Sequence, residues 1–139
     1  MASELPDTFK QLRTLVTEDG KLELSLADVK VPTPGDNDIV IRVEATPINP
    51  SDLGLLVGAG DLSTLRNEGS KNNPKLVADI SGAGMRAMQP RIGQSLAVGN
   101  EGAGTVVAAG SSDAAQALMG KKVTGLGGEF YGEYRMLNV

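Results

Sequence analysis

The sequence predicts a mainly β fold, and three observations support that prediction. Segments of alternating apolar and polar residues recur along the chain, and Ile39 to Thr46 is the clearest of them. Glycine and proline, 18 and 7 of 139 residues, separate these segments and predict frequent turns. The helical segments are few and short. This pattern is typical of an all-β barrel or sandwich with small helical additions and a core of Val, Leu, Ile and Ala.

The first predicted element is a hairpin. Gln11 to Thr17 and Lys21 to Leu26 flank the dipeptide Asp19-Gly20, and the second segment alternates leucines with polar residues. Asp-Gly between two such segments is a strong hairpin signal.

The middle of the chain predicts a strand, a short helix and a loop. The strand Ile39 to Thr46 ends at Pro47, and Ser51 to Gly58 has the composition of a short capped helix. Gly60 to Pro74 is expected to be a polar excursion.

The second half predicts further short elements. Strands are expected at Lys75 to Ile80, Gly104 to Ala108, Lys121 to Leu126 and Glu133 to Val139, and a helix from Ser111 or Ser112 to Met119. Because no internal repeat and no long linker divides the chain, residues 1–139 are expected to form a single domain.

One segment imitates a dinucleotide-binding fingerprint. Gly82 to Ala87 follows a predicted strand and has the pattern G-x-G-x-x-A. Pro90 stops any helix there after about two turns, and no parallel strand with an acidic end follows. A plain glycine turn before a short helix is therefore the preferred interpretation.

Composition excludes several function classes. The chain has no Cys and no His, which removes disulfides, Cys/His metal sites, thiolate nucleophiles and Ser-His triads. A net charge of -4 without a basic run excludes nucleic acid and anionic membranes as partners. Without a targeting segment or a long apolar stretch, the sequence predicts a cytoplasmic protein.

Four motifs occur in order along the chain: Thr46 to Asp52 (TPINPSD), Val98 to Gly110 (VGNEGAGTVVAAG), Gly120 to Val123 (GKKV) and Tyr131 to Tyr134 (YGEY). Together they resemble the N-terminal catalytic domain of the medium-chain dehydrogenase/reductase superfamily, in its zinc-independent quinone oxidoreductase branch. The resemblance extends from about Leu12 to the end of the chain. It implies a GroES-like, alcohol dehydrogenase-like β-barrel with short helices.

The resemblance also implies that residues 1–139 are one domain of a longer two-domain enzyme. In that family NADP(H) or NAD(H) binds between this domain and a Rossmann domain that comes later in the chain, and none lies within this one. The implied activity is reduction of a quinone or another activated carbonyl or enone. A homodimer is compatible with the resemblance. This chain alone is expected to bind no cofactor and to be inactive.

The resemblance points to individual site residues. In the zinc-dependent branch the first motif supplies a Cys and the second a His to the metal. Asn49 and Asn100 hold those positions here, and amides are far weaker zinc donors. Ser51 matches a hydroxyl that relays the alcohol proton in the zinc enzymes. Asp52 and Glu101 match acidic residues of the two motifs.

Hydride transfer to a carbonyl needs a donor near its oxygen, which a neutral amide or hydroxyl can supply. Asn49 and Ser51 are therefore the catalytic candidates. We expect Asn49 and Pro50 to lie against the cofactor. Asn100 and Glu101 are expected to lie next to the substrate.

Each candidate has a structural alternative. Asn49 to Asp52 contains residue types that turns and helix caps select, and we assign Asp52 to the cap. Glu101 is either a buried carboxylate with a hydrogen-bonded partner or a site residue. Tyr131 and Tyr134 are assigned to the core or to a domain interface.

A second function class stays open, because a fold alone does not fix function. A non-enzymatic GroES-like module would use the barrel for assembly or binding. Co-chaperonins of that fold form rings and carry a mobile loop, a part that Gly60 to Pro74 could play. The pairing of Asn49 to Asp52 with Gly99 to Glu101 favours the enzyme, because a ring protein does not need it.

We predict that the protein binds no stoichiometric zinc, because it has no thiolate or imidazole and carboxylate-only sites favour Mg²⁺ or Ca²⁺. The measurement is elemental analysis of the dialysed protein. One tightly held zinc ion per chain would contradict the prediction.

Overall fold

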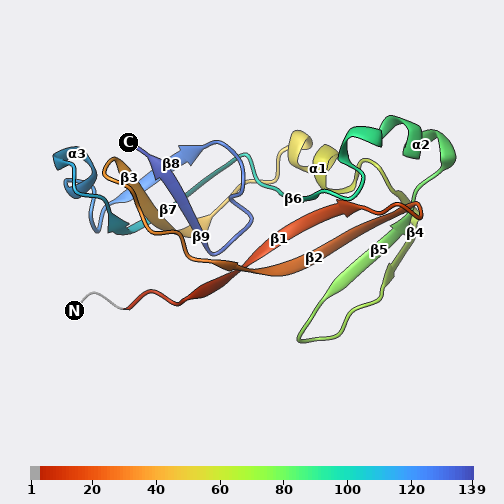
Figure 1. The fold of residues 1–139 in the computed structure, drawn as a ribbon, viewed down its shortest axis with the longest axis horizontal. Coiled ribbons are helices and arrows are strands. Elements are labelled where there is room, and N and C mark those ends of the chain that lie inside the picture. Colours follow the sequence, from red (N-terminus) through yellow and green to blue (C-terminus); the bar gives the residue numbers. More distant parts are fainter. Residues whose placement is uncertain (1–3) are drawn as a thin grey trace. The chain divides into compact units, whose positions relative to one another are not determined.

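The computed structural model describes residues 4–139, and the chain is mainly β (Figure 1). The strands are β1 Thr8–Val16, β2 Lys21–Lys30, β3 Asp38–Ala45, β4 Asp61–Asn67, β5 Lys75–Asp79, β6 Ser95–Ala97, β7 Glu101–Ala109, β8 Lys122–Leu126 and β9 Tyr134–Asn138. The helices are α1 Pro50–Val57, α2 Gly82–Ala87, α3 Asp113–Gln116 and a 3-10 turn at Gln89–Arg91. None of these helices is long and apolar enough to cross a bilayer.

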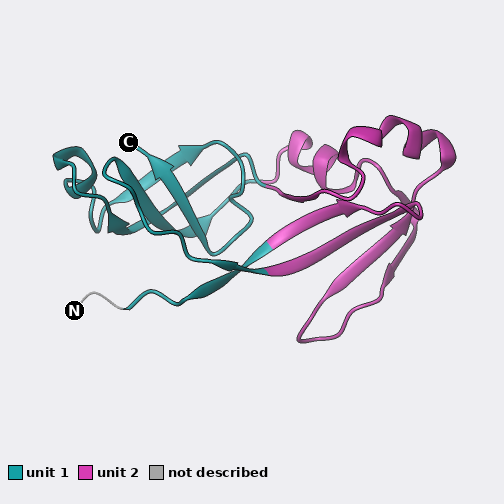
Figure 2. Cartoon of the chain, in the orientation of Figure 1, with its two compact units in different colours: residues 1–11, 28–47, 99–139 teal, residues 12–27, 48–98 magenta. Residues whose placement is uncertain are grey.

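The strands form two sheets. One has the order β4-β5-β2-β1-β6 and the other the order β8-β7-β3-β9. The described residues divide into two compact units, coloured separately in Figure 2. The first unit holds the chain up to Gln11, Asp28–Pro47 and Gly99–Val139; the second holds Leu12–Ala27 and Ile48–Val98. The single-domain organisation expected for residues 1–139 stays a prediction.

The predicted hairpin is confirmed as β1 and β2. At its turn Gly20 has a φ of 81°, a conformation that glycine adopts without steric cost. The Thr17 backbone N–H donates to the Lys21 carbonyl at 2.8 Å and closes the turn. The strands predicted around residues 39–46, 75–80, 104–108, 121–126 and 133–139 are likewise confirmed as β3, β5, β7, β8 and β9.

The segment Gly60 to Pro74, predicted as a polar excursion, contains a strand that was not predicted: β4 lies in its first half and pairs with β5. No residue of β4 is buried, so no apolar alternation marked it as a strand. Polar side chains hold it instead. Thr64 Oγ1 accepts the Asp79 backbone N–H at 2.8 Å, and Arg66 donates to the Asp79 carboxylate at 3.1 Å.

The segment that imitates a dinucleotide fingerprint forms α2. The sequence predicted a glycine turn before a short helix. The helix instead begins at Gly82, so the glycines lie inside it. Its cap is Ser81, whose Oγ accepts the Gly84 backbone N–H at 3.0 Å. The preceding strand β5 pairs antiparallel with both β2 and β4, whereas a dinucleotide fold needs parallel strands.

Each unit has its own core. In the second unit, the buried side chains on β1, on β2, on β5 and directly after β5 pack against partly buried residues of α1 and α2. The buried members are Val16, Leu22, Leu24, Ala78 and Ile80. Arg91 adds a polar tie, because its guanidinium donates to the Leu55 carbonyl at 3.1 Å and to Thr14 Oγ1 at 3.2 Å.

The core of the first unit centres on Phe130, which is completely buried. Its ring lies against Gly102 of β7 and Gly125 of β8, which are direct cross-strand partners. A Cβ at Gly102 would overlap the ring, and one at Gly125 would lie 3.1 Å from Phe130 Cζ. The Arg135 guanidinium lies 5.8 Å from the ring centroid. The two glycines therefore form the seat of the ring.

We predict that Gly102→Ala destabilises the protein by about 1–3 kcal/mol, the usual cost of overpacking a core. The matched control is Gly54→Ala in α1, where a Cβ meets nothing within 4 Å. That change should stabilise the protein by about 0.5–1 kcal/mol, because alanine has lower unfolded-state entropy. Urea unfolding of both variants measures the difference. Equal effects of the two substitutions would contradict the packing of the Phe130 ring on Gly102.

Candidate functional site

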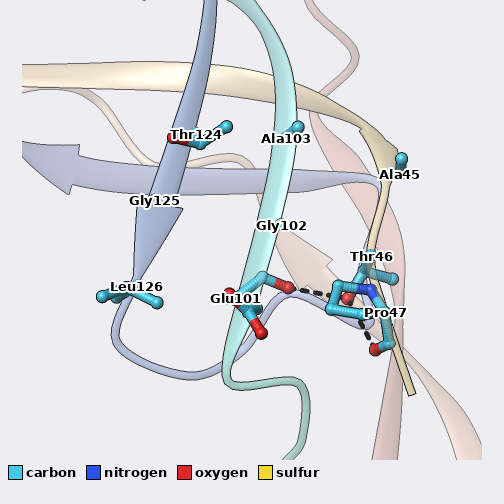
Figure 3. Close-up of a pocket in the computed structure, with 9 residues that line it drawn as sticks. All are labelled: Ala45, Thr46, Pro47, Glu101, Gly102, Ala103, Thr124, Gly125 and Leu126. Atoms are coloured by element: carbon cyan, nitrogen blue, oxygen red, sulfur yellow. Dashed lines mark hydrogen bonds between the residues drawn. The ribbon is translucent and has the colours of Figure 1, made fainter. Parts of the chain in front are cut away.

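A pocket with a volume of about 770 Å³ lies in the first unit. It opens on one face of the four-stranded sheet, where β3 ends beside β7 and β8 lies on the other side of β7 (Figure 3). Its lining residues are Ala45, Thr46, Pro47, Glu101, Gly102, Ala103, Thr124, Gly125 and Leu126.

The floor of the pocket is made of small residues. Ala103 pairs directly with Ala45 on β3 and with Thr124 on β8, so three short side chains lie in one row across the sheet. The next row pairs Glu101 with Leu126, which is 74% exposed. Because side chains alternate between the faces of a sheet, this pocket lies on the face opposite Phe130.

Two hydroxyl groups fix the end of β3 at the pocket. Thr46 Oγ1 donates to the Glu101 carbonyl at 2.7 Å (Figure 3). The Tyr131 hydroxyl donates to the Pro47 carbonyl at 3.0 Å. These bonds bring together three of the four sequence motifs, although Thr46 and Glu101 are 55 residues apart.

Gly99 makes room for Tyr131. Its φ of 104° is a left-handed conformation that favours glycine. A Cβ at this position would lie 2.6 Å from the Tyr131 nitrogen and 2.8 Å from its Cδ1. The Gly99 carbonyl also accepts the Phe130 backbone N–H at 3.1 Å. The second and fourth motifs are therefore packed backbone to backbone.

The predicted catalytic residues Asn49 and Ser51 lie in the second unit, with Pro50 between them. Asn49 is half-buried and is the N-cap of α1, and Pro50 is the first helical residue. The assignment of Asp52 to the cap is confirmed. Its carboxylate accepts the Asn49 backbone N–H at 3.0 Å, and its side chain is almost completely buried.

The predicted substrate-adjacent residues Asn100 and Glu101 lie in the first unit. Asn100 is exposed, and its carbonyl accepts the Gly127 backbone N–H at 2.9 Å. Glu101 is half-buried and lines the pocket. Of the predicted site residues, the pocket of the first unit thus contains Glu101.

Sequence reasoning missed part of the pocket wall. Thr124 and Leu126 lie in a predicted strand, and their alternation with Gly125 places both on one face. That signal was present in the sequence. Which strand lies beside them depends on the pairing of β8 with β7, which no local pattern specifies.

A charged network borders the small-residue floor. The Glu44 carboxylate accepts the Thr105 hydroxyl at 2.6 Å and forms an ion pair with Lys122. The hydrogen bond from Lys122 lowers the pKa of Glu44 below its usual value, and the Thr105 hydroxyl lowers it further. Among residues 4–139, no three acidic side chains gather into a group that could hold a metal ion.

Comparison with known proteins adds no relative: no family model matches the chain, and no curated protein matches it. The functional proposal therefore rests on the sequence motifs and on the geometry of the pocket.

We predict that the Glu44 network stabilises the fold at neutral pH and loses this effect in acid. Because the folded pKa lies below the unfolded value of 4.5, the contribution is present above 4.5 and is lost as pH falls through the folded pKa. The effect is small because the carboxyl is exposed. Melting temperatures of Glu44→Gln and the wild type should converge in acid. The control is Glu18→Gln, an exposed carboxyl in the β1–β2 turn. A wild-type advantage that persists in acid would contradict the prediction.

Proposed function

We propose that this chain is the GroES-like catalytic-domain portion of a zinc-independent, NAD(P)H-dependent oxidoreductase. Its substrate would be a quinone or another activated carbonyl or enone. The complete enzyme would include a Rossmann domain that binds the cofactor. The mainly β fold of residues 4–139 is compatible with this proposal.

The observation that carries the proposal is the hydrogen bond from Thr46 to the Glu101 carbonyl, at the edge of the pocket of the first unit. It joins two motifs that the family resemblance assigns to the reaction site. Their meeting at this pocket favours a binding site over two unrelated turns.

The lining of the pocket suits a neutral, flat acceptor. Alanines, glycines and threonines form most of its wall; Glu101 is the one charged residue among the lining residues, and neither Lys nor Arg contributes. A quinone or enone presents a planar face and a carbonyl oxygen, and it needs contact area more than an opposite charge.

A bound nicotinamide would supply the hydride. In this chain Asn49 and Pro50 are the residues proposed to lie against the nicotinamide, and the Asn49 side-chain amide would donate to the carbonyl oxygen of the substrate. The residues here do not suit the diphosphate of the cofactor. The six-residue helix α2 follows an antiparallel strand, and its cap Ser81 already accepts the Gly84 N–H. The diphosphate would therefore be held by the Rossmann domain.

The backbone near Asn49 is restricted by two prolines. Pro47 and Pro50 fix their own φ near about -65°, and a residue before proline is held extended. Asn49 has a φ of -89° and a ψ of 155°, in agreement with that restriction. A segment restricted in this way loses little entropy when a ligand orders it.

The non-enzymatic assembly module gains no specific support. The mobile loop that it would need was expected at Gly60 to Pro74, and β4 occupies 61–67 of that segment.

The direct test is the protein encoded by the complete reading frame that contains this chain. We expect the DNA downstream of Val139 to encode a βαβ pattern with G-x-G-x-x-G/A, and the protein to oxidise NADPH or NADH when a quinone is present. A frame without that pattern, or a ring-forming protein without this activity, would overturn the proposal.

We predict that Asn49→Ala in that complete protein lowers kcat/KM by about tenfold or more, the effect of one lost hydrogen bond in a dry site. Ser51→Ala should cost less, because without zinc there is no metal-bound alkoxide for its hydroxyl to serve. The control is Asn72→Ala in an exposed loop of the same unit. If Asn49→Ala unfolds the protein and the folded fraction keeps full activity, Asn49 is a structural cap.

A further inference from the structure

Two side chains bind the C-terminal end of helix α1. The last four carbonyls of a helix have no partner within it, and in α1 two of them accept from other elements. The Leu55 carbonyl accepts the Arg91 guanidinium at 3.1 Å. The Leu56 carbonyl accepts the Thr14 hydroxyl at 3.1 Å. All four residues belong to the second unit, so the end of α1 is held there to β1 and to the 3-10 turn.

Thr14 joins the two contacts into one network. Its side chain is completely buried, and its Oγ1 also accepts the Arg91 guanidinium at 3.2 Å. The hydroxyl thus donates to α1 and accepts from the 3-10 turn at the same time, which satisfies the hydrogen-bonding requirement of a buried hydroxyl. Removing this hydroxyl would open the network in two places.

Arg91 is held in this network as a charge bound by neutral oxygens. None of the ion pairs among residues 4–139 involves it. Its Nε is buried without a hydrogen-bond partner in that part of the chain, and burial lowers the pKa of its guanidinium. Apolar residues of similar volume often stabilise a fold as well as buried charges do. What an apolar residue would not supply is the planar donor fork that reaches the Leu55 carbonyl and Thr14 together.

Asn49 lies at the other end of the same helix. Its carbonyl accepts the Leu53 backbone N–H at 3.1 Å, and its own backbone N–H donates to the Asp52 carboxylate at 3.0 Å. Both backbone groups of Asn49 are thus bonded into the first turn of α1. The eight helical residues span about 12 Å. Because so short a helix moves as one piece, an anchor at its C-terminal end fixes the direction of its N-terminal end.

We propose that Arg91 and Thr14 are positioning residues: they fix the C-terminal end of α1 and so set the orientation of this helix, and of its cap Asn49, within the second unit. For its effect on catalysis this inference rests on the proposed function, which assigns the Asn49 amide to the substrate oxygen. The anchor itself consists of three hydrogen bonds inside one unit.

Four variants separate the anchor from side-chain volume and charge. Thr14→Val removes the hydroxyl and keeps the shape, and Thr14→Ser restores the hydroxyl. Arg91→Met removes the donors and keeps a long side chain. The matched control is Arg86→Met, which makes the same chemical change at an exposed arginine of α2 in the same unit.

The first experiment measures residual dipolar couplings of backbone N–H groups in the 139-residue chain. In the wild type, one alignment should fit both α1 and β5, because both lie in the second unit. We expect this common fit to be lost in Thr14→Val and Arg91→Met and to be kept in Thr14→Ser and Arg86→Met. A common fit in all four variants would overturn the anchor. If Arg91→Met does not fold, the two Thr14 variants decide.

The second experiment measures quinone reduction by the complete protein, below the melting temperature of every variant. Thr14→Val should lower kcat by about fivefold, the effect of one neutral hydrogen bond, with little change in the KM for the quinone. Thr14→Ser and Arg86→Met should keep the wild-type kcat.

A change in stability alone would leave the kcat of the folded protein unaltered. An unchanged kcat in folded Thr14→Val would therefore overturn the positioning role. A wild type without activity would instead overturn the proposed function, and the dipolar couplings would still test the anchor.

Discussion

The packing of Phe130 on the paired glycines of β7 and β8 is the contact on which the first unit depends. A flat ring can approach two strands at once only where both lack side chains, and Gly102 and Gly125 meet that condition because they face each other across the ladder. The residues on either side of the glycines, Glu101 and Ala103 on β7 and Thr124 and Leu126 on β8, point to the opposite face and line the pocket. The core around Phe130 therefore lies on one face of the Gly102–Gly125 pair, and the pocket lies on the other face.

The residue after Phe130 extends this arrangement to the proposed reaction site. Phe130 is anchored through its backbone to Gly99, which places Tyr131 where its hydroxyl meets the end of β3. Core packing and site geometry are therefore coupled through adjacent residues. A change that shifts the Phe130 ring would therefore be transmitted to Pro47 through Tyr131.

The sequence predicted the strands and turns whose own residues show apolar alternation or a turn motif. The hairpin turn at Gly20 and the strand β3 both follow from short-range alternation and turn chemistry. The strand β4 was not predicted because polar side chains hold it to Asp79. Such contacts produce no alternation of apolar and polar residues in the sequence. The motif residues of the site were recognisable, whereas the pocket wall required the register of β7 against β8, which is a property of the folded chain.

Because neither unit is built from one continuous stretch of chain, their order of completion during synthesis is constrained. Residues 12–27 and 48–98 leave the ribosome before the final segment, so the second unit has all its strands while the first still lacks β7, β8 and β9. During that interval β3 has neither of its neighbours in the sheet, and its buried isoleucines are uncovered. The nascent protein would at that stage be most in need of a chaperone.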